Sequence, residues 1–290
     1  MTTKEGLDIS AKNGAAAPRQ TRMEEMVHYQ RDLSFPLVRN DHPQAISPAQ
    51  IDFYNDNGYL LPFDIFDERE IADHRVQFDD LLARVQACGE SSYSINGYHS
   101  KCAGIYDLCV EPRIVRIVKD ILGDDLICWG THYFCKMPGE GKQVAWHQDA
   151  TYWPFDKSRT VTVWLAIDDA DRANGAMKVI PGSHRLGPMT SKASEASDQN
   201  VLADVVPDAE AYGEPVYFEL RGGQASVHTD MLLHGSEPNS SDRRRCGLTI
   251  RYCTPDVRSL EDYHHGAILV SGSDPENRWP HTARPEGDGF

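Results

Sequence analysis

Two short segments of the chain contain metal-binding residue types at a spacing that could place them on one cation. His147 and Asp149 are two residues apart, and on an extended chain residues i and i+2 point to the same side. His228 and Asp230 form a second pair of the same kind. With twelve histidines in the chain, about one such pair is expected by chance, so the spacing alone does not select a site.

The residues that follow favour the first pair. Downstream of it, His234 could supply a second imidazole, and Arg245 could supply a guanidinium for an anionic ligand. The second pair has only His264 and His265 after it, without a matching arginine. Fe(II) oxygenases bind their metal through two histidines and one carboxylate on one face, which leaves the opposite positions for co-substrate and oxygen. We therefore predict that the first pair and His234 bind iron, and that His228 is a core residue or lies behind the ligands.

The order of the surrounding motifs resembles that of the phytanoyl-CoA dioxygenase family. The resemblance runs from about residue 51 to residue 254 and rests on several motifs in a fixed order. They are Trp146-His147-Gln148-Asp149, Trp164-Leu165-Ala166-Ile167-Asp168-Asp169, Asn174-Gly175, Pro181-Gly182-Ser183-His184, and His234-Gly235-Ser236 with Arg245. The resemblance implies a double-stranded β-helix that uses Fe(II), 2-oxoglutarate and O2 and releases succinate and CO2.

Site residues follow from the resemblance position by position. His147, Asp149 and His234 match the iron ligands of the family. Arg245, eleven residues after His234, matches the residue that binds the distal carboxylate of 2-oxoglutarate. A planar guanidinium suits this role because it binds a carboxylate through two parallel hydrogen bonds. Arg251 is the competing candidate, and its simpler interpretation is a strand residue in a structural ion pair.

Three further positions match residues that lie near the co-substrate in the family, namely His132, Trp164 and Gln148. The alternative is packing for the tryptophan, and bonding to solvent or to residues behind the ligands for the glutamine. Relatives that halogenate their substrates lack the carboxylate ligand, which opens a position for halide. Because Asp149 is present here, we expect hydroxylation instead.

The residues that could recognise a substrate form three groups. Tyr152 and Trp153 follow the metal motif and could form an apolar wall or a cage for a cationic head group, or simply belong to the core. A polar stretch in which the family has pocket-facing residues contains Asn96, Tyr98, His99 and Lys101. Residues of an insertion and of the tail could close over a polar substrate or be solvated surface; they are Asn200, Arg284 and Asp288.

Similarity also suggests a substrate class. Bacterial proteins with Trp-His-Gln-Asp-Ala-Thr-Tyr-Trp, as at residues 146–153, and with Arg-Tyr in the last strand include hydroxylases of short aminoalkyl- or trimethylammonioalkyl-phosphonates. Natural-product or amino-acid scaffolds are the next alternative. A coenzyme A thioester is disfavoured because the sequence offers no extended basic groove for its phosphates. Two other classes stay open: a jelly-roll small-molecule binder or sensor, and a cupin-like metal enzyme that does not use 2-oxoglutarate.

The pattern of apolar residues predicts a mostly β chain with flanking helices around a jelly-roll, cupin-like core. Ser47-Pro48-Ala49-Gln50 has the form of a capping box, and the helix that it opens should end at Asn57-Gly58. Further helices are expected at about 68–86 and from Glu111-Pro112 to Gly123. Strands are expected at 59–63, 126–137, 160–167, 176–180, 216–220, 224–229 and 246–253.

This pattern suggests one domain over residues 21–290, preceded by a disordered segment at 1–20. The helical part should extend to about residue 123 and the jelly-roll core over about 124–255, with a tail after it. Residues 183–215 are polar and acidic and are expected to form an insertion or lid.

Composition argues against several kinds of partner. The chain has 290 residues and a formal net charge of −15, and its densest basic cluster is only Arg243-Arg244-Arg245. Broad phosphate neutralisation needs clustered lysine and arginine, so we expect no nucleic-acid partner. No apolar run of about 18 residues and no signal pattern is present, so we expect no membrane contact and a cytoplasmic location. The seven scattered cysteines lack a CxxC motif and are expected to be reduced.

Overall fold

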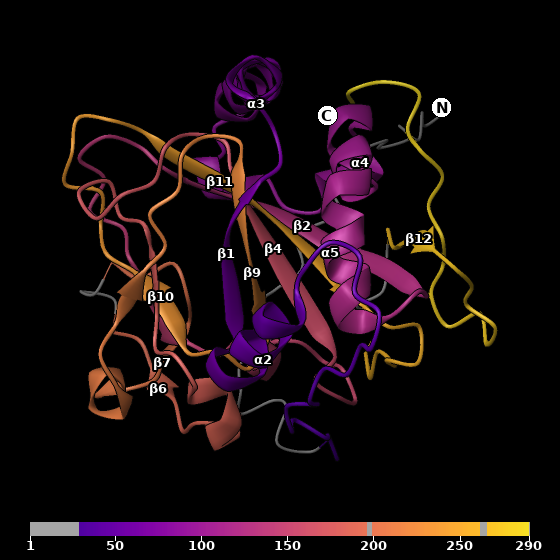
Figure 1. Cartoon of the computed structure of the whole chain (residues 1–290). Helices are drawn as coiled ribbons and strands as arrows, with labels where there is room; N and C mark the ends of the chain where they lie inside the picture. The colour runs from indigo at the N-terminus through magenta and orange to yellow at the C-terminus, as the bar shows by residue number, and fades with distance from the viewer. Residues whose placement is uncertain (1–28, 196–198, 262–265, 290) are drawn as a thin grey trace, which may run out of the picture.

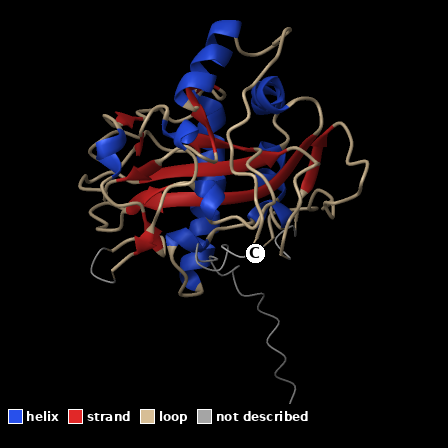
Figure 2. Cartoon of the chain, turned by 90° about the horizontal axis from the view of Figure 1, so that it is seen from below, coloured by secondary structure: helices blue, strands red, loops and turns tan. Residues whose placement is uncertain are grey.

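Two antiparallel sheets packed on each other form the centre of the structure (Figure 1). The structure is a computed structural model, and it describes residues 29–195, 199–261 and 266–289. The larger sheet has the strand order β1-β9-β4-β11-β2-β12, and the smaller sheet has the order β3-β10-β5-β8. Figure 2 shows the long strands of the larger sheet running side by side. The mostly β architecture with flanking helices confirms the predicted fold class.

The strands of the larger sheet are β1 (Tyr59–Asp64), β9 (Gln224–Thr229), β4 (Thr160–Ala166), β11 (Arg245–Cys253), β2 (Leu126–Lys136) and β12 (Ile268–Ser271). Those of the smaller sheet are β3 (Val144–His147), β10 (His234–Ser236), β5 (Met177–Val179) and β8 (Val216–Tyr217). A separate two-stranded ribbon consists of β6 (Lys192–Ala193) and β7 (Asp204–Val205). The sequence pattern did not predict β3, β10 or β12.

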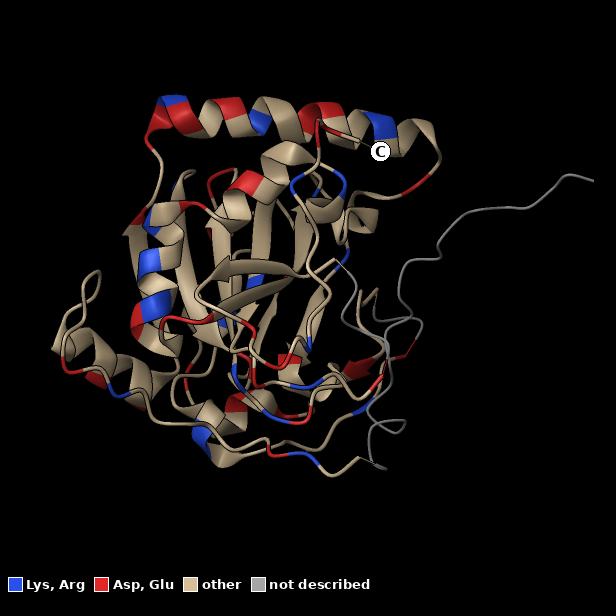
Figure 3. Cartoon of the chain, turned by 90° about the vertical axis from the view of Figure 1, so that its right-hand side faces the viewer, with Lys and Arg blue, Asp and Glu red and all other residues tan. Residues whose placement is uncertain are grey.

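The longer helices are α2 (Pro48–Asn57), α3 (Glu68–Ala87), α4 (Ala103–Cys109) and α5 (Pro112–Leu122). The capping box is confirmed: the Ser47 side chain accepts a hydrogen bond from the Gln50 amide, and the Gln50 side chain accepts one from the Ser47 amide. Gly58, at φ +84°, ends this helix. Charges of both signs are interspersed along α3 (Figure 3). Among the described helices, none combines the length and apolar character that crossing a membrane requires.

Alternation along the strands of the larger sheet separates two environments. On β11, Cys246, Leu248, Ile250 and Tyr252 belong to the hydrophobic cluster that the sheet shares with α3, α4 and α5. The residues between them therefore face the smaller sheet, because successive side chains of a strand point to opposite faces. We propose that the helical part and the jelly-roll core form one domain, since they share this cluster. The expected disorder of residues 1–20 lies outside the described residues.

The segment expected to be an insertion or lid contributes to the core. Met189, Val206 and Ala209 are buried in a cluster with Ile180 and Leu233, against which Trp146 packs. The Val206 amide donates a hydrogen bond to the Trp146 carbonyl, so this segment lies directly on the strand that leads to the metal motif.

The seven cysteines are free, and all except Cys88 are buried. This agrees with the expected reduced thiols.

A glycine of β11 makes room for a large ring between the sheets, which yields a prediction. A Cβ atom at Gly247 would lie 2.0 Å from the Trp164 ring, closer than any real contact allows. We expect Gly247→Ala to displace the ring and to lower the free energy of unfolding by about 1–3 kcal/mol. Denaturant unfolding and the near-ultraviolet circular dichroism of tryptophan would measure both effects. Gly130→Ala is the matched control, because a Cβ atom there meets nothing closer than 3.9 Å. Equal stability and unchanged spectra for the two variants would contradict this packing.

A buried histidine generates a second prediction. His99 bonds through its two ring nitrogens to the Thr131 hydroxyl and the Gly266 carbonyl, and burial lowers its pKa to about 4. An unfolded histidine takes up its proton near pH 6.5, so between pH 6.5 and 4 the unfolded state binds more protons. Stability should fall as the pH falls through this window, with His99 contributing up to about 3 kcal/mol. We expect His99→Gln to flatten the dependence of the free energy of unfolding on pH, and His42→Gln, at an exposed site, to leave it unchanged. A parallel pH dependence in both variants would be inconsistent with this role.

Candidate metal centre and co-substrate pocket

The smaller sheet brings the predicted metal ligands together. β3 and β10 pair antiparallel with His147 opposite His234, and the centres of the two imidazole rings are 4.0 Å apart. Asp149 follows β3 in a short 3-10 turn, and its Oδ1 atom lies 3.5 Å from Nε2 of His147 and 3.9 Å from Nε2 of His234. One ligand atom from each residue lies within 4.8 Å of the others, the one such His, Cys, Asp or Glu group found among the described residues.

Backbone carbonyls orient both imidazoles for metal binding. Nδ1 of His147 bonds to the Ala145 carbonyl at 2.8 Å, and Nδ1 of His234 bonds to the Leu232 carbonyl at 2.9 Å. A carbonyl can only accept, so each Nδ1 carries a proton, and each Nε2 faces Asp149 as the ring atom available to a metal. Such contacts behind a metal ligand fix its tautomer and orientation.

The charge states of the cluster also suit a cation. Burial by itself would raise the pKa of Asp149, but His147 and His234 hold it well below its ordinary value. Burial lowers the pKa of His234 well below its ordinary value, which favours the neutral imidazole that a metal needs. Two imidazoles and one carboxylate, oriented toward one point, are the donor set of non-haem Fe(II), and the residues therefore fit this metal.

The three ligands open into a hollow between the sheets, here called the metal pocket. Its apolar lining consists of Phe134, Val144, Trp164, Met177 and Gly235. Its polar lining consists of His228, Ser236, Arg245, Thr249 and Arg251. Arg245, Thr249 and Arg251 lie at alternate positions of β11 and therefore point inward together.

Arg245 fits the predicted co-substrate role. Its terminal nitrogens donate to the Phe134 and Gly175 carbonyls at 3.1 and 2.9 Å, while its Nε is buried without a partner. No carboxylate of a described residue forms an ion pair with it. The side chain is thus held rigidly by neutral acceptors and keeps its charge for an anion that enters the metal pocket.

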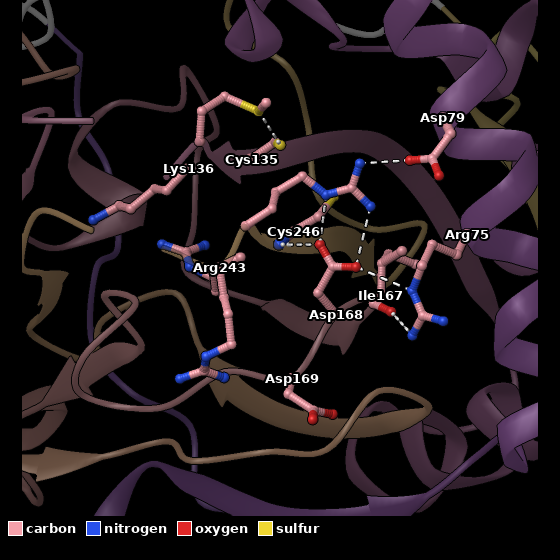
Figure 4. Close-up of polar contacts among 12 residues, drawn as sticks. Arg75, Asp79, Cys135, Lys136, Ile167, Asp168, Asp169, Arg243 and Cys246 are labelled. Carbon is pink, nitrogen blue, oxygen red and sulfur yellow. Dashed lines mark hydrogen bonds and ion pairs between the residues drawn. The ribbon is translucent and has the colours of Figure 1, made fainter. Parts of the chain in front are cut away.

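The basic cluster at residues 243–245 does not form a common patch. Arg243 pairs with Asp171, and Arg244 pairs with Asp168 and Asp79. Figure 4 shows Asp168 at the centre of a network that also includes Arg75 and the Cys246 amide. This network ties the start of β11 to α3. Arg244 is fixed on the outer side while its neighbour Arg245 points inward.

Lys136 and Ser236 join the site without having been expected there. Lys136 lies opposite Arg245 in the β2–β11 register and donates to the Ser236 hydroxyl at 2.8 Å and to the Ser236 carbonyl. Burial, with help from Arg245, lowers the pKa of Lys136 to about 6. Because the Ser236 hydroxyl accepts from this lysine, its own proton is directed toward another acceptor. Alternation along β2 could have indicated the lysine, but no motif pointed to it.

Of the other residues expected near the co-substrate, only Trp164 lines the metal pocket. Trp164 lies in the metal pocket with Arg245 5.7 Å from its ring centre. His132 bonds through Nε2 to the Tyr93 carbonyl and is not among the described lining residues. Gln148 points away from the pocket, because its side chain bonds to the backbone of Gly187, Met189 and Met231. Since its amide is fully occupied there, the geometry points away from the co-substrate role expected for Gln148.

The aromatic candidates Tyr152 and Trp153 both belong to a buried hydrophobic cluster and are not among the described lining residues of the metal pocket. The Tyr152 ring is 5.9 Å from that of His147, and its hydroxyl donates to the Asp204 carbonyl. The Trp153 ring lies 5.3 Å from the guanidinium carbon of Arg251. The structural ion pair expected for Arg251 is a wrong expectation: among the described residues this guanidinium has no carboxylate within ion-pair distance.

The remaining substrate candidates lie away from the metal pocket. Asn96 is bridged to His132 at the β2 edge, His99 is occupied by Thr131 and Gly266, and Lys101 lies over the Tyr98 ring. None of these four polar-stretch residues is among the described lining residues.

The insertion and tail candidates serve as tethers. Asn200 accepts a hydrogen bond from the Ala145 amide and so holds the insertion against β3. Arg284 pairs with Asp107, and Asp288 accepts from the Gly104 amide, so both fix the tail to α4. Asn200 and Asp288 bond to strand and helix backbone and Arg284 to a helix side chain, which argues against the expected closure over a substrate.

The competing metal pair is not assembled. The Asp230 carboxylate is occupied by the Ser158 hydroxyl and the Thr160 amide, and burial raises its pKa to about 6. His228 lines the metal pocket with its ring centre 5.0 Å from that of His234, but among the described residues it has no hydrogen-bond partner.

Comparison with known proteins points to one family. The family model described as phytanoyl-CoA dioxygenase matches residues 54–247. A Caenorhabditis elegans protein described as a probable phytanoyl-CoA dioxygenase is 25% identical over 240 residues, which cover 73% of this chain and 77% of that protein. A Stutzerimonas stutzeri protein described as a probable alpha-ketoglutarate-dependent hypophosphite dioxygenase is 29% identical over 177 residues, which cover 58% and 60% of the two chains.

The solved structures agree with this family. The apo form of ThoJ, a non-heme monooxygenase, has a TM-score of 0.69 at 28% identity and covers 82% of this chain and 88% of its own. Structures at 19–20% identity, described as holding Fe(II) or 2-oxoglutarate, have the same fold. The chain belongs to the phytanoyl-CoA dioxygenase family and is a non-haem iron dioxygenase that uses Fe(II) and 2-oxoglutarate.

Proposed function

We propose that this dioxygenase hydroxylates an unactivated C–H bond of a small polar metabolite. The observation that carries the proposal is the convergence of His147, Asp149 and His234 in one pocket with the carboxylate-free Arg245. The retained Asp149 favours hydroxylation over halogenation, because it fills the position that halogenating relatives leave for halide.

The roles of the chain's own residues follow from their placement. When bound, Fe(II) with 2-oxoglutarate and O2 supplies the oxidation that replaces C–H by C–OH and releases succinate and CO2. His147, Asp149 and His234 would hold the metal, and Arg245 would orient the distal carboxylate of 2-oxoglutarate. The apolar walls at Trp164 and elsewhere exclude water, which protects a reactive centre from side reactions. No side-chain acid or base is needed.

Our best specific candidate for the substrate is a short aminoalkyl- or trimethylammonioalkyl-phosphonate. The Trp-His-Gln-Asp-Ala-Thr-Tyr-Trp motif at 146–153 and the Arg251-Tyr252 pair resemble those of bacterial phosphonate hydroxylases. The Stutzerimonas relative is described as acting on hypophosphite, which is also a phosphorus oxyanion. Both observations support a compact phosphorus-containing anion over a long acyl thioester.

The aromatic pair Tyr152 and Trp153 is better suited to apolar contact than to a cation cage. A trimethylammonium group on the Trp153 ring would share that ring with the Arg251 guanidinium. Two cations on one ring repel each other, so the ammonium end of such a substrate has to lie elsewhere.

The metal assignment predicts a specific loss of iron. Asp149→Ala should weaken Fe(II) binding at least about tenfold, because it removes the one anionic ligand of the site. Anaerobic equilibrium dialysis against Fe(II) measures the affinity. Asp256→Ala, which removes an exposed carboxylate, should bind as the wild type does. The assignment fails if the Asp149 variant retains full affinity.

The co-substrate assignment predicts that a change at Arg245 lowers the affinity for 2-oxoglutarate specifically. Arg245→Met should weaken its binding about 30-fold or more, since a buried charge-assisted pair contributes about 2–5 kcal/mol. The charge-transfer absorption of anaerobic Fe(II) protein reports the titration, and Arg243→Met is the control at an exposed, already paired arginine. Unchanged affinity in Arg245→Met would leave a metal enzyme that does not use 2-oxoglutarate as the better interpretation. Tight ligand binding without substrate-dependent succinate release would favour a binder or sensor.

A further inference from the structure

A row of polar side chains crosses the larger sheet beside the metal centre. Arg251 of β11 lies opposite Thr162 of β4, and Thr162 lies opposite His228 of β9. Directly opposed residues of antiparallel strands project from the same face. Because Leu248 and Ile250 of β11 face the helices, this row faces the smaller sheet. Arg251 and His228 line the metal pocket, and Thr162 lies between them on the sheet. The three residues are here called the polar row.

Every member of the polar row has a buried polar atom without a partner among the described residues. These atoms are Nε of Arg251, Oγ1 of Thr162 and both ring nitrogens of His228. More than nine in ten buried polar groups in proteins are hydrogen-bonded. Three adjacent residues with unpartnered buried polar atoms, on three neighbouring strands next to a metal centre, indicate a site that binds a ligand.

Arg251 carries the charge of the row. Its side chain is only 8% exposed, and among the described residues its guanidinium has neither a hydrogen bond nor an ion pair. The Trp129 and Trp153 rings lie 5.6 and 5.3 Å from its carbon and restrict its position without neutralising it. Opposite it on β2 stands Gly130, and the Arg251 side chain lies next to the position that a Cβ atom of this glycine would take. An arginine cannot release its proton to relieve burial, so this site calls for an anion.

The carboxylate that Arg245 would bind is too far away to bond to Arg251 as well. Arg245 and Arg251 are six residues apart on β11, which separates their Cα atoms by roughly 20 Å at about 3.3 Å per residue. Arg245 lies at the end of the pocket formed with Phe134 and Gly175, whereas the polar row reaches the metal through His228, whose ring is 5.0 Å from that of His234. The two arginines therefore face different anionic groups on two sides of the metal centre.

We propose that Arg251, Thr162 and His228 form a substrate subsite for a compact oxyanion, a phosphonate or a carboxylate, at the side of the metal away from Arg245. The guanidinium offers two parallel donors, and the hydroxyl and the imidazole each offer one more. The inference rests on the proposed function, because a substrate has to lie beside the metal for one of its C–H bonds to be hydroxylated. It assigns the orientation of the substrate, with the oxyanion at the polar row.

The test uses the full-length protein loaded with Fe(II) and 2-oxoglutarate without oxygen. The probes are methylphosphonate and acetate, with dimethyl methylphosphonate and acetamide as their uncharged counterparts. Calorimetric titration and the change in the charge-transfer absorption measure binding. We expect at least one anion to bind and its uncharged counterpart not to bind. The anion that binds with the higher affinity identifies the class of oxyanion. No difference between anions and uncharged probes would overturn the proposal.

Variants then locate the binding. Arg251→Met should weaken the bound anion at least tenfold, and Arg251→Lys should weaken it less, because the charge remains while the fork is lost. Thr162→Val, which keeps the shape of the side chain, should weaken it several-fold and provides a second variant if Arg251→Met does not fold. Arg258→Met, at an exposed arginine, is the charge-matched control and should bind as the wild type does. Wild-type affinity in both the Arg251→Met and Thr162→Val variants would overturn the proposal.

Two further readouts separate this subsite from other roles. The affinity for 2-oxoglutarate should stay within about threefold of wild type in Arg251→Met while it collapses in Arg245→Met; equal loss in both would assign Arg251 to the co-substrate and overturn the proposal. In the ligand-free protein, Arg251→Met should melt no lower than the wild type, since it removes an unpaired buried charge. A lower melting temperature combined with unchanged anion binding would show a structural role instead. Absence of iron and 2-oxoglutarate binding in the wild type would refute the proposed function, a result distinct from these.

Discussion

The antiparallel pairing of β3 with β10 is the constraint on which the site depends. Each strand is only three or four residues long, yet their register places His147 directly opposite His234. A shift of one residue would turn one imidazole to the other face of the sheet, and the cluster would be lost. The carbonyls of Ala145 and Leu232, each two residues before a ligand, then fix both rings from within the same chain segments. The ligand geometry is therefore built from local backbone and one register.

In the larger sheet, the alternation of side chains separates a face that packs in the core from a face that lines the metal pocket. One face of β11 supplies Leu248, Ile250 and neighbouring residues to the main hydrophobic cluster, while the other face carries Arg245, Thr249 and Arg251 into the metal pocket. The strand is thus anchored by its apolar face and by the Asp168 network at its start. Such anchoring allows the opposite face to hold buried polar groups that contribute nothing to folding, which is typical of functional sites.

The sequence predicted the long elements well because their signals are local. A capping box and a glycine delimit α2, and alternation over nine residues identifies β11. β3 and β10 were missed because three or four residues are too few to show a period, although the metal motif lay on them. The triad itself was predictable only through the motif order and not through the spacing of His147 and Asp149, which chance also provides at His228 and Asp230.

The residues expected near the co-substrate or the substrate do not all lie at the metal pocket, and the reason is physical. Trp164 lies on the inner face of its strand, whereas Gln148, between two inward ligands, has to point outward, where backbone groups occupy its amide. Asn200, Arg284 and Asp288 are polar residues whose partners come from distant segments, Ala145, Asp107 and Gly104. Only the folded chain reveals such partners. The unpaired state of Arg251 was hidden for the same reason, since a sequence cannot show that a charge lacks its counterion.

The formal charges of the loaded pocket connect these observations. A divalent metal, the Asp149 carboxylate, the Arg245 guanidinium and a dianionic co-substrate together cancel, so the centre is neutral once iron and 2-oxoglutarate are bound. Arg251 then remains as one uncompensated cation in a water-poor cavity, where an unpaired charge is costly. A substrate that brings an anion of its own restores neutrality, and a neutral or cationic substrate does not. The pocket is thus electrostatically complete only with an anionic group at the polar row, which makes charge, more than shape, the first criterion by which this enzyme would select its substrate.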